Sequence, residues 1–167
     1  MAFNIGDTVS YGLDGVCRIT QIVEKEFRDQ PVQYYVLVPV FNSRSTIFVP
    51  VENDALASRM RYAHSAEELS EIMLSAPDDD TLWTDNESER KVRFKEVLHS
   101  GDVREIIRLV RTLYHHRESQ KAIGKKLHMA DDRFFKDAER LLYDEYAAAF
   151  GISPIEALPH IMKLFEG

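Results

Sequence analysis

Short strand-forming runs separated by tight turns fill the first 61 residues, and this alternation constrains the fold more than any other feature of the chain. Side chains typical of strands concentrate in four runs, at residues 8–11, 16–26, 33–41 and 46–49. Turn-forming residues stand between these runs, at 13–15, 28–31 and 42–43. Several short strands at this spacing are typical of a barrel or a sandwich. Because the segment is so short, we expect the smaller option, an SH3- or Tudor-like β-barrel.

Helical signals replace the strand pattern after residue 64. Ser65 with Glu68 predicts a capping box before an amphipathic helix. Start signals predict further helices beginning near Thr84, Asp102, Asp131 and Ser153. The chain is therefore expected to be α+β, with a small N-terminal β-barrel followed by a C-terminal all-α domain.

An acidic stretch divides the helical part of the chain. Residues 76–80 read Ala-Pro-Asp-Asp-Asp, a composition typical of a linker. We therefore expect a barrel domain at residues 1–62, a connecting helix and acidic linker at 63–82, and a helical domain at 83–167.

Composition and charge exclude several classes of protein. A net charge of −7 argues against a general DNA coat, because phosphate neutralisation supplies most nonspecific affinity. Residues 83–126 nevertheless carry eleven basic and seven acidic side chains, so any nucleic-acid surface is expected there. One cysteine, Cys17, excludes an internal disulfide framework and fits a reducing cytoplasm. No stretch has the length and apolar character of a membrane span or a signal peptide, and a monomeric cytoplasmic protein is expected.

Eight separated motifs occur in one order along the chain. They lie at Ile5–Tyr11 with Gly15-Val16, Tyr34–Leu37, Val49–Val51, Arg59–Arg61, Trp83 with Asn86 and Arg90, Ser100–Asp102, Ile107–Tyr114 and Ala138–Glu145. No single motif is specific, but the ordered set resembles the CarD family of bacterial transcription regulators, also called CdnL. The resemblance covers essentially the whole chain.

The resemblance implies a fold and a function. In that family the Tudor-like N-terminal module, which recurs in the transcription-repair coupling factor, binds the β subunit of RNA polymerase. The helical domain reaches the upstream edge of the melted promoter, where a tryptophan wedges into the minor groove. The expected function is therefore stabilisation of the open complex through contacts that do not read sequence. We expect no enzymatic activity and no cofactor.

The run before residue 51 is the candidate polymerase-binding strand. An exposed strand edge is a template for pairing with another sheet. We expect Arg44, Ile47, Phe48 and Val49 to contact the polymerase, with Lys25 as an ionic contact. In the alternative, Ile47 and Val49 face the barrel core and only Phe48 points outward.

Trp83 and a set of basic residues are the candidate DNA contacts. Trp83 is the expected wedge, although the family's wedge position corresponds to Glu87, one helical turn away. In the alternative, Trp83 packs on the helical domain or the barrel. The basic candidates are Arg90, Lys91, Arg93, Arg104, Arg108 and Arg111. Their alternative is a solvated helix face.

Three further patterns are weak candidates for chemistry. His115, His116 and His128 lack the spacing of metal ligands, so no metal site is expected. Cys17 has no histidine partner nearby and is expected to be a small core or face residue rather than a nucleophile. Gly124-Lys125-Lys126 lacks the rest of a phosphate loop.

The competing function is a protein adaptor whose barrel binds a partner strand while the helical domain makes no DNA contact.

Overall fold

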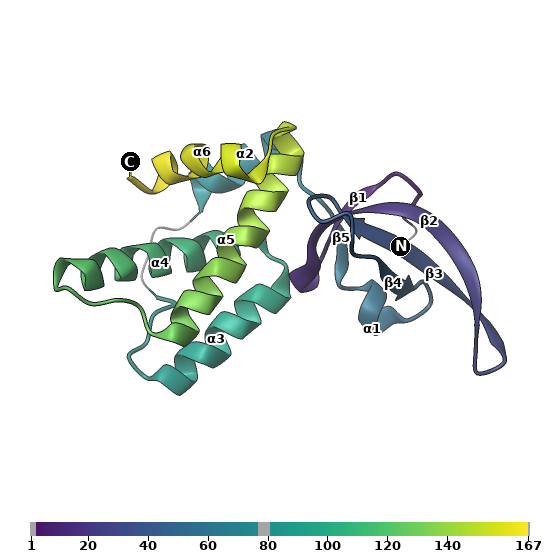
Figure 1. The fold of residues 1–167 in the computed structure, drawn as a ribbon, viewed down its shortest axis with the longest axis horizontal. Coiled ribbons are helices and arrows are strands. Elements are labelled where there is room, and N and C mark those ends of the chain that lie inside the picture. The colour runs from purple at the N-terminus through teal and green to yellow at the C-terminus, as the bar shows by residue number, and fades with distance from the viewer. Residues whose placement is uncertain (1–2, 77–80, 167) are drawn as a thin grey trace.

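The computed structural model describes residues 3–76 and 81–166, and it has an N-terminal sheet followed by a helical body (Figure 1). The strands are β1 (Thr8–Tyr11), β2 (Gly15–Phe27), β3 (Gln30–Pro39), β4 (Ile47–Pro50) and β5 (Met60–Tyr62). The helices are η1 (Gly12–Asp14), α1 (Asp54–Ala57), α2 (Ala66–Ser75), α3 (Glu87–Ser100), α4 (Val103–Ala122), α5 (Met129–Phe150) and α6 (Pro154–Glu166). The expected α+β class is confirmed.

All five strands form one antiparallel sheet in the order β4-β3-β2-β1-β5. The sheet is curved like a barrel, but it does not close, because β4 pairs only with β3 and β5 only with β1 among the described strands. Its concave face holds a core of aliphatic and aromatic side chains that includes Val9, Cys17, Ile19, Leu37 and Val49. Residues at alternate strand positions share this face, as the pleat requires.

The β2–β3 hairpin is longer than the sequence predicts. Arg28 and Asp29 have φ angles of 53° and 61°, so the chain reverses within these two residues and β3 begins at Gln30. Two consecutive positive φ values match the twist of the flanking strands. The expected turn at residues 28–31 is therefore too long, and the hairpin extends away from the helical body (Figure 1).

Two short elements and two helix starts differ from the sequence prediction. Helix α1 and strand β5 were not expected, because four- and three-residue elements carry little periodic signal. Helix α3 begins after Asn86 rather than near Thr84, since the Asn86 side chain accepts a hydrogen bond from the Glu89 amide. Helix α5 begins at Met129, before the expected Asp131.

The helical body has its own core, which α2 shares with the four longer helices. Leu69 and Met73 of α2 pack with Phe94 of α3, Leu113 of α4 and Leu142 of α5. The connecting helix therefore belongs to the helical body by packing. The predicted domain boundaries, 1–62, 63–82 and 83–167, remain a proposal. Residues 77–80, which include most of the acidic stretch, lie outside the described part of the chain.

A buried carboxylate joins the sheet to the helical body. Glu145 of α5 accepts two hydrogen bonds from the Arg61 guanidinium of β5, at 2.7 and 3.0 Å, and a third from the His64 amide at 3.0 Å. Arg61 also donates from Nε to the Gly101 carbonyl at 2.8 Å. Since bidentate arginine–carboxylate pairs are directional, this contact fixes the orientation of the two parts.

A second contact closes the junction from the other side of α5. The Arg140 guanidinium donates to the Leu13 carbonyl of η1 at 2.6 Å. Gly15 has a φ of 74°, and a Cβ there would lie 3.3 Å from Leu141 Cδ2. Glycine is therefore favoured at position 15, because it adopts the left-handed backbone conformation without strain and lets β2 approach α5 closely.

Replacing Glu145 by alanine is expected to destabilise the protein by about 2–3 kcal/mol, because Arg61 and the His64 amide lose a shared, mostly buried acceptor. Chemical denaturation followed by circular dichroism measures this change. Glu71→Ala, at an exposed position of α2, is the control and should change stability by less than about 0.5 kcal/mol. Equal effects of the two substitutions would contradict the proposed role of Glu145.

Candidate functional site

Strand β4 presents an unpaired edge whose hydrogen-bonding groups belong chiefly to Phe48. The Val51 amide donates to the Gln33 carbonyl of β3 at 3.0 Å. Because hydrogen-bonded positions alternate in an antiparallel pair, Val49 and Ile47 also bond toward β3. The amide and carbonyl of Phe48 therefore point away from the sheet. Pro50 also faces outward but has no amide hydrogen, and its carbonyl accepts from Asn53 at 3.3 Å.

The Phe48 side chain lies on the convex face of the sheet and is 43% exposed. Lys25 Nζ of β2 is 4.0 Å from the centre of the Phe48 ring, within range of a cation–π contact. The Tyr34 ring meets Phe48 edge to face, with centroids 6.2 Å apart. The structure thus brings together Lys25 and Phe48, which the sequence analysis proposed from separate strands.

Two of the proposed contact side chains point inward. Val49 is fully buried in the concave core, and Ile47 is half-buried against it. Their main-chain groups face β3, so neither offers a main-chain donor to the open edge. The expectation of a direct contact by the Val49 side chain is corrected accordingly, whereas a contact by the partly exposed Ile47 side chain stays a proposal. Arg44 is exposed in the turn that leads into β4.

Trp83 is half-buried on the helical body. Its ring stacks on His116 of α4, with centroids 3.6 Å apart and planes 27° apart. The Arg90 guanidinium lies 4.4 Å from the ring centre, and the indole Nε1 donates to Asp85 at 3.1 Å. The packing that sequence analysis gave as the alternative is therefore present. Any insertion into DNA requires Trp83 to leave this stack or to use its exposed edge.

Arg90 is buried and cannot reach DNA from this position. It is 3% exposed and donates from Nε and Nη2 to the two carboxylate oxygens of Asp131, at 3.0 and 2.9 Å. Nη1 donates to the Thr84 carbonyl at 3.0 Å. Arg90 instead fastens the segment before α3 to the start of α5, so its proposal as a phosphate contact is corrected.

The arginines along α4 bind the last residue of α2 and the chain that follows it. Arg104 donates to Ser75 at 2.7 Å, Arg111 donates to the Ala76 carbonyl at 2.9 Å, and Arg108 donates to Thr81 as well as to Glu105. These intramolecular contacts account for the row of basic residues opposite the apolar face of α4, so phosphate binding is not needed to explain that row. Lys91 and Arg93 remain at the surface of α3, where Lys91 pairs with Glu87 at 3.5 Å.

A basic cleft at the end of α4 escaped the sequence analysis. Its volume is about 560 Å³, and its basic walls are Arg117, Lys121, Lys125 and Lys126. Gly124, with a φ of 73°, turns the chain after α4, and the Lys125 amide bonds back to the Gln120 carbonyl at 2.8 Å. The sequence signal was the Gly124-Lys125-Lys126 run, which sequence analysis weighed only as a phosphate loop. The turn gathers these cations on one side.

Two family models match most of the chain. The first covers the sheet and the second covers most of the helical body. The CarD-like/TRCF RID domain matches residues 3–62, and the CarD C-terminal domain matches residues 71–161. The chain belongs to the CarD family. A curated relative, "Putative transcription factor YdeB" of Bacillus subtilis (strain 168), is 27% identical over 158 residues, which cover 90% of this chain and 94% of that protein.

Membership of the CarD family places the two candidate surfaces in different modules. The β4 edge lies in the first match, the polymerase-interacting module, and Trp83 and the basic cleft lie in the second. The family assignment supports a role in transcription through RNA polymerase.

Within residues 3–76 and 81–166, no helix has the length and apolar character needed to cross a membrane.

Cys17 and the candidate metal ligands, which the sequence analysis considered for chemistry, show no reactive arrangement in the described part of the chain. Burial raises the pKa of the Cys17 thiol to about 12, with a further increase from nearby Asp14, so the thiol stays protonated at neutral pH. It is fully buried in the sheet core, as expected. In the part of the chain that the structure describes, no three histidine, cysteine or acidic residues gather as metal ligands do.

Arg90→Ala is expected to cost about 3 kcal/mol of folding stability, because Asp131 is left buried without its partner. Lys91→Ala, at the neighbouring exposed position, should change stability by less than about 0.5 kcal/mol. Urea denaturation of both variants measures the difference. If Arg90→Ala were as stable as the wild type, the structural role assigned to Arg90 would be wrong.

Proposed function

We propose that this chain binds the β subunit of RNA polymerase through the β4 edge and stabilises the promoter open complex through contacts that do not read sequence. The observation that carries the proposal is the unpaired edge at Phe48, where an exposed aromatic ring and outward main-chain groups belong to one residue. Strand addition at such an edge draws affinity from main-chain bonds and specificity from the flanking side chains. Lys25 and Arg44 supply positive charge beside it. We propose a monomer that acts in the cytoplasm, without enzymatic activity or a cofactor.

The edge is built for a short pairing. Phe48 provides one outward donor and one outward acceptor, while the following outward position is Pro50, which has no donor. Proline at this place blocks a continuous ladder and protects the edge from indiscriminate association. A specific partner must therefore gain most of its remaining affinity from the Phe48 ring and the charges around it.

We propose that the second contact, with DNA at the upstream fork, uses the far end of the helical body. Trp83 stacks on His116 of α4, and Arg117, the next residue of that helix, begins the basic cleft. Cations that bind phosphates, next to an aromatic ring that contacts bases, are the usual requirements for binding a melted or bent duplex. Surface residues Lys91 and Arg93 add to this end, whereas Arg104, Arg108 and Arg111 contribute less because they bind the chain's own residues.

The competing function is a protein adaptor that makes no DNA contact. The packing of Trp83 against His116 and the buried ion pair of Arg90 favour it, since both remove expected DNA contacts. Binding to forked promoter DNA, measured by fluorescence anisotropy with and without polymerase, separates the two functions. Absence of binding in both conditions would favour the adaptor.

Phe48→Asp is expected to weaken binding to RNA polymerase by at least about tenfold, because it removes an exposed aromatic anchor and places a carboxylate at the edge. The matched control is Tyr62→Asp, since Tyr62 is 46% exposed on β5 at the opposite edge of the same sheet. Co-purification and calorimetric titration with polymerase measure the effect. If both variants bind like the wild type, the β4 edge is not the docking site.

Trp83→Ala is expected to leave polymerase binding unchanged and to shorten the lifetime of the open complex, because a base-to-aromatic contact contributes about 1–3 kcal/mol. Competitor-challenge assays on a linear promoter measure the lifetime. Circular dichroism must show that the variant folds, since Trp83 also packs on His116. An unchanged lifetime in a folded variant would remove Trp83 from the mechanism.

Replacing Lys121, Lys125 and Lys126 together by glutamine is expected to weaken DNA binding for all sequences alike. The slope of log affinity against log salt should become shallower by about 2–3, since each phosphate contact contributes nearly one counterion. Lys163→Gln, on the exposed surface of α6 and outside the cleft, is the control. An unchanged slope in the triple variant would mean that the cleft does not bind phosphates.

A further inference from the structure

A cavity of about 470 Å³ lies where the sheet meets the helical body. Three segments far apart in the sequence form it: the loop at residues 39–45, the turn at η1, and the helix α5 with the start of α6. Small-molecule sites have this size and occur preferentially at domain interfaces. The cavity uses none of the residues proposed above for polymerase or DNA contact.

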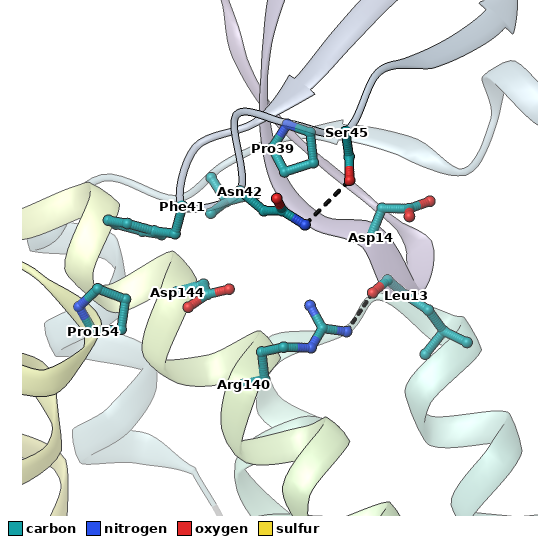
Figure 2. A pocket seen from close by; sticks show the side chains of 10 residues that line it. Leu13, Asp14, Pro39, Phe41, Asn42, Ser45, Arg140, Asp144 and Pro154 are labelled. Carbon is teal, nitrogen blue, oxygen red and sulfur yellow. Dashed lines mark hydrogen bonds between the residues drawn. The ribbon is translucent and has the colours of Figure 1, made fainter.

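Three charged groups line this cavity: Asp14 of η1, and Arg140 and Asp144 of α5, which are opposite in sign. Arg140 and Asp144 are one turn apart on α5, so both side chains lie on the same face of the helix. Figure 2 shows the Asp144 carboxylate directed into the cavity beside the guanidinium of Arg140. No ion pair joins the two residues in the described part of the chain, so space remains between them.

Each charge on α5 is held in place and retains bonding capacity. Arg140 donates from Nη2 to the Leu13 carbonyl at 2.6 Å, and in Figure 2 its other terminal nitrogen faces the cavity. Asp144 is half-buried and, among the described residues, accepts no hydrogen bond. Burial raises the pKa of the Asp144 carboxyl, and the nearby Arg140 charge opposes that increase. A partly desolvated carboxylate without a donor gains free energy from a cationic ligand group.

The rest of the lining is apolar on one side. The rings of Phe41 and Pro154 lie beyond Asp144 in Figure 2, and Phe41 remains 39% exposed. On the other side, the Asn42 amide donates to Ser45 at 3.1 Å, which fixes the loop above the charges and leaves its carbonyl oxygen available. A ligand therefore meets two carboxylates, one guanidinium and an apolar wall within one cavity.

We propose that this cavity binds a small zwitterion of the α-amino-acid type with an apolar side chain. The ligand carboxylate would pair with Arg140, its ammonium with Asp144, and its side chain would pack on Phe41 and Pro154. A simple anion would meet the carboxylates of Asp14 and Asp144, and a simple cation would leave Arg140 without an anionic partner. Because the cavity is walled by both the sheet and the helical body, a bound amino acid bridges the two parts and stiffens their junction.

Binding is tested on the full chain with L-leucine, L-phenylalanine and the other standard amino acids as probes, using 1H–15N spectra and thermal shift. At least one apolar amino acid should raise the unfolding temperature and shift the amides of residues 39–45 and of α5 near Asp144. Its N-acetyl and amide derivatives, which lack one charge each, should bind at least about tenfold more weakly. The proposal would be overturned if no amino acid gave a response, or if both derivatives bound as tightly as the parent amino acid.

Variants assign the binding to this cavity. Asp144→Asn keeps the shape of the side chain and should weaken binding at least about tenfold, whereas Asp137→Asn, on the same helix outside the cavity, should not. Phe41→Ser should weaken binding of L-leucine more than that of glycine. Unchanged affinity in both Asp144→Asn and Phe41→Ser would place the ligand elsewhere. The assay contains no polymerase or DNA, so its outcome is independent of the proposed function.

Discussion

The contact on which the rest of the structure depends is the bidentate bond between Glu145 and Arg61. It joins the last strand of the sheet to the longest helix, and the His64 amide completes the bonding of the carboxylate. The two proposed surfaces lie on different parts of the molecule, and this contact fixes the relation between those parts. Since Glu145 is buried and its partners are directional donors, the junction has one preferred geometry rather than a range of angles.

The two proposed surfaces rely on different physics. At the proposed β4 edge, affinity would come from a few main-chain groups, one exposed ring and the charges of Lys25 and Arg44, so salt should matter less there than at the cleft. At the end of α4, four cations gather around an open cleft, and phosphate attraction there should fall steeply with salt. The arrangement fits a protein that is held firmly by a protein partner and contacts DNA weakly, which agrees with its overall negative charge.

The sequence predicted local features well and long-range pairings poorly. Strand alternation gave the arrangement with Phe48 outward and Val49 inward only as the alternative to contacts by both residues, and the structure has that alternative. The capping box at Ser65 was found because both its residues are close in sequence. The burial of Arg90 could not be foreseen, since its partner Asp131 is 41 residues away. The basic cleft was missed for a related reason: the turn at Gly124, rather than helical periodicity, brings Lys125 and Lys126 beside Lys121.

Amide hydrogen exchange at Phe48 tests the central claim most directly. The Phe48 amide points away from the sheet, so it should exchange quickly in the free protein and slowly once RNA polymerase is bound. The amide of Val49, which already bonds toward β3, and those of β5 should change little. Slow exchange of the Phe48 amide in the free protein, or no protection on binding polymerase, would contradict docking through the β4 edge.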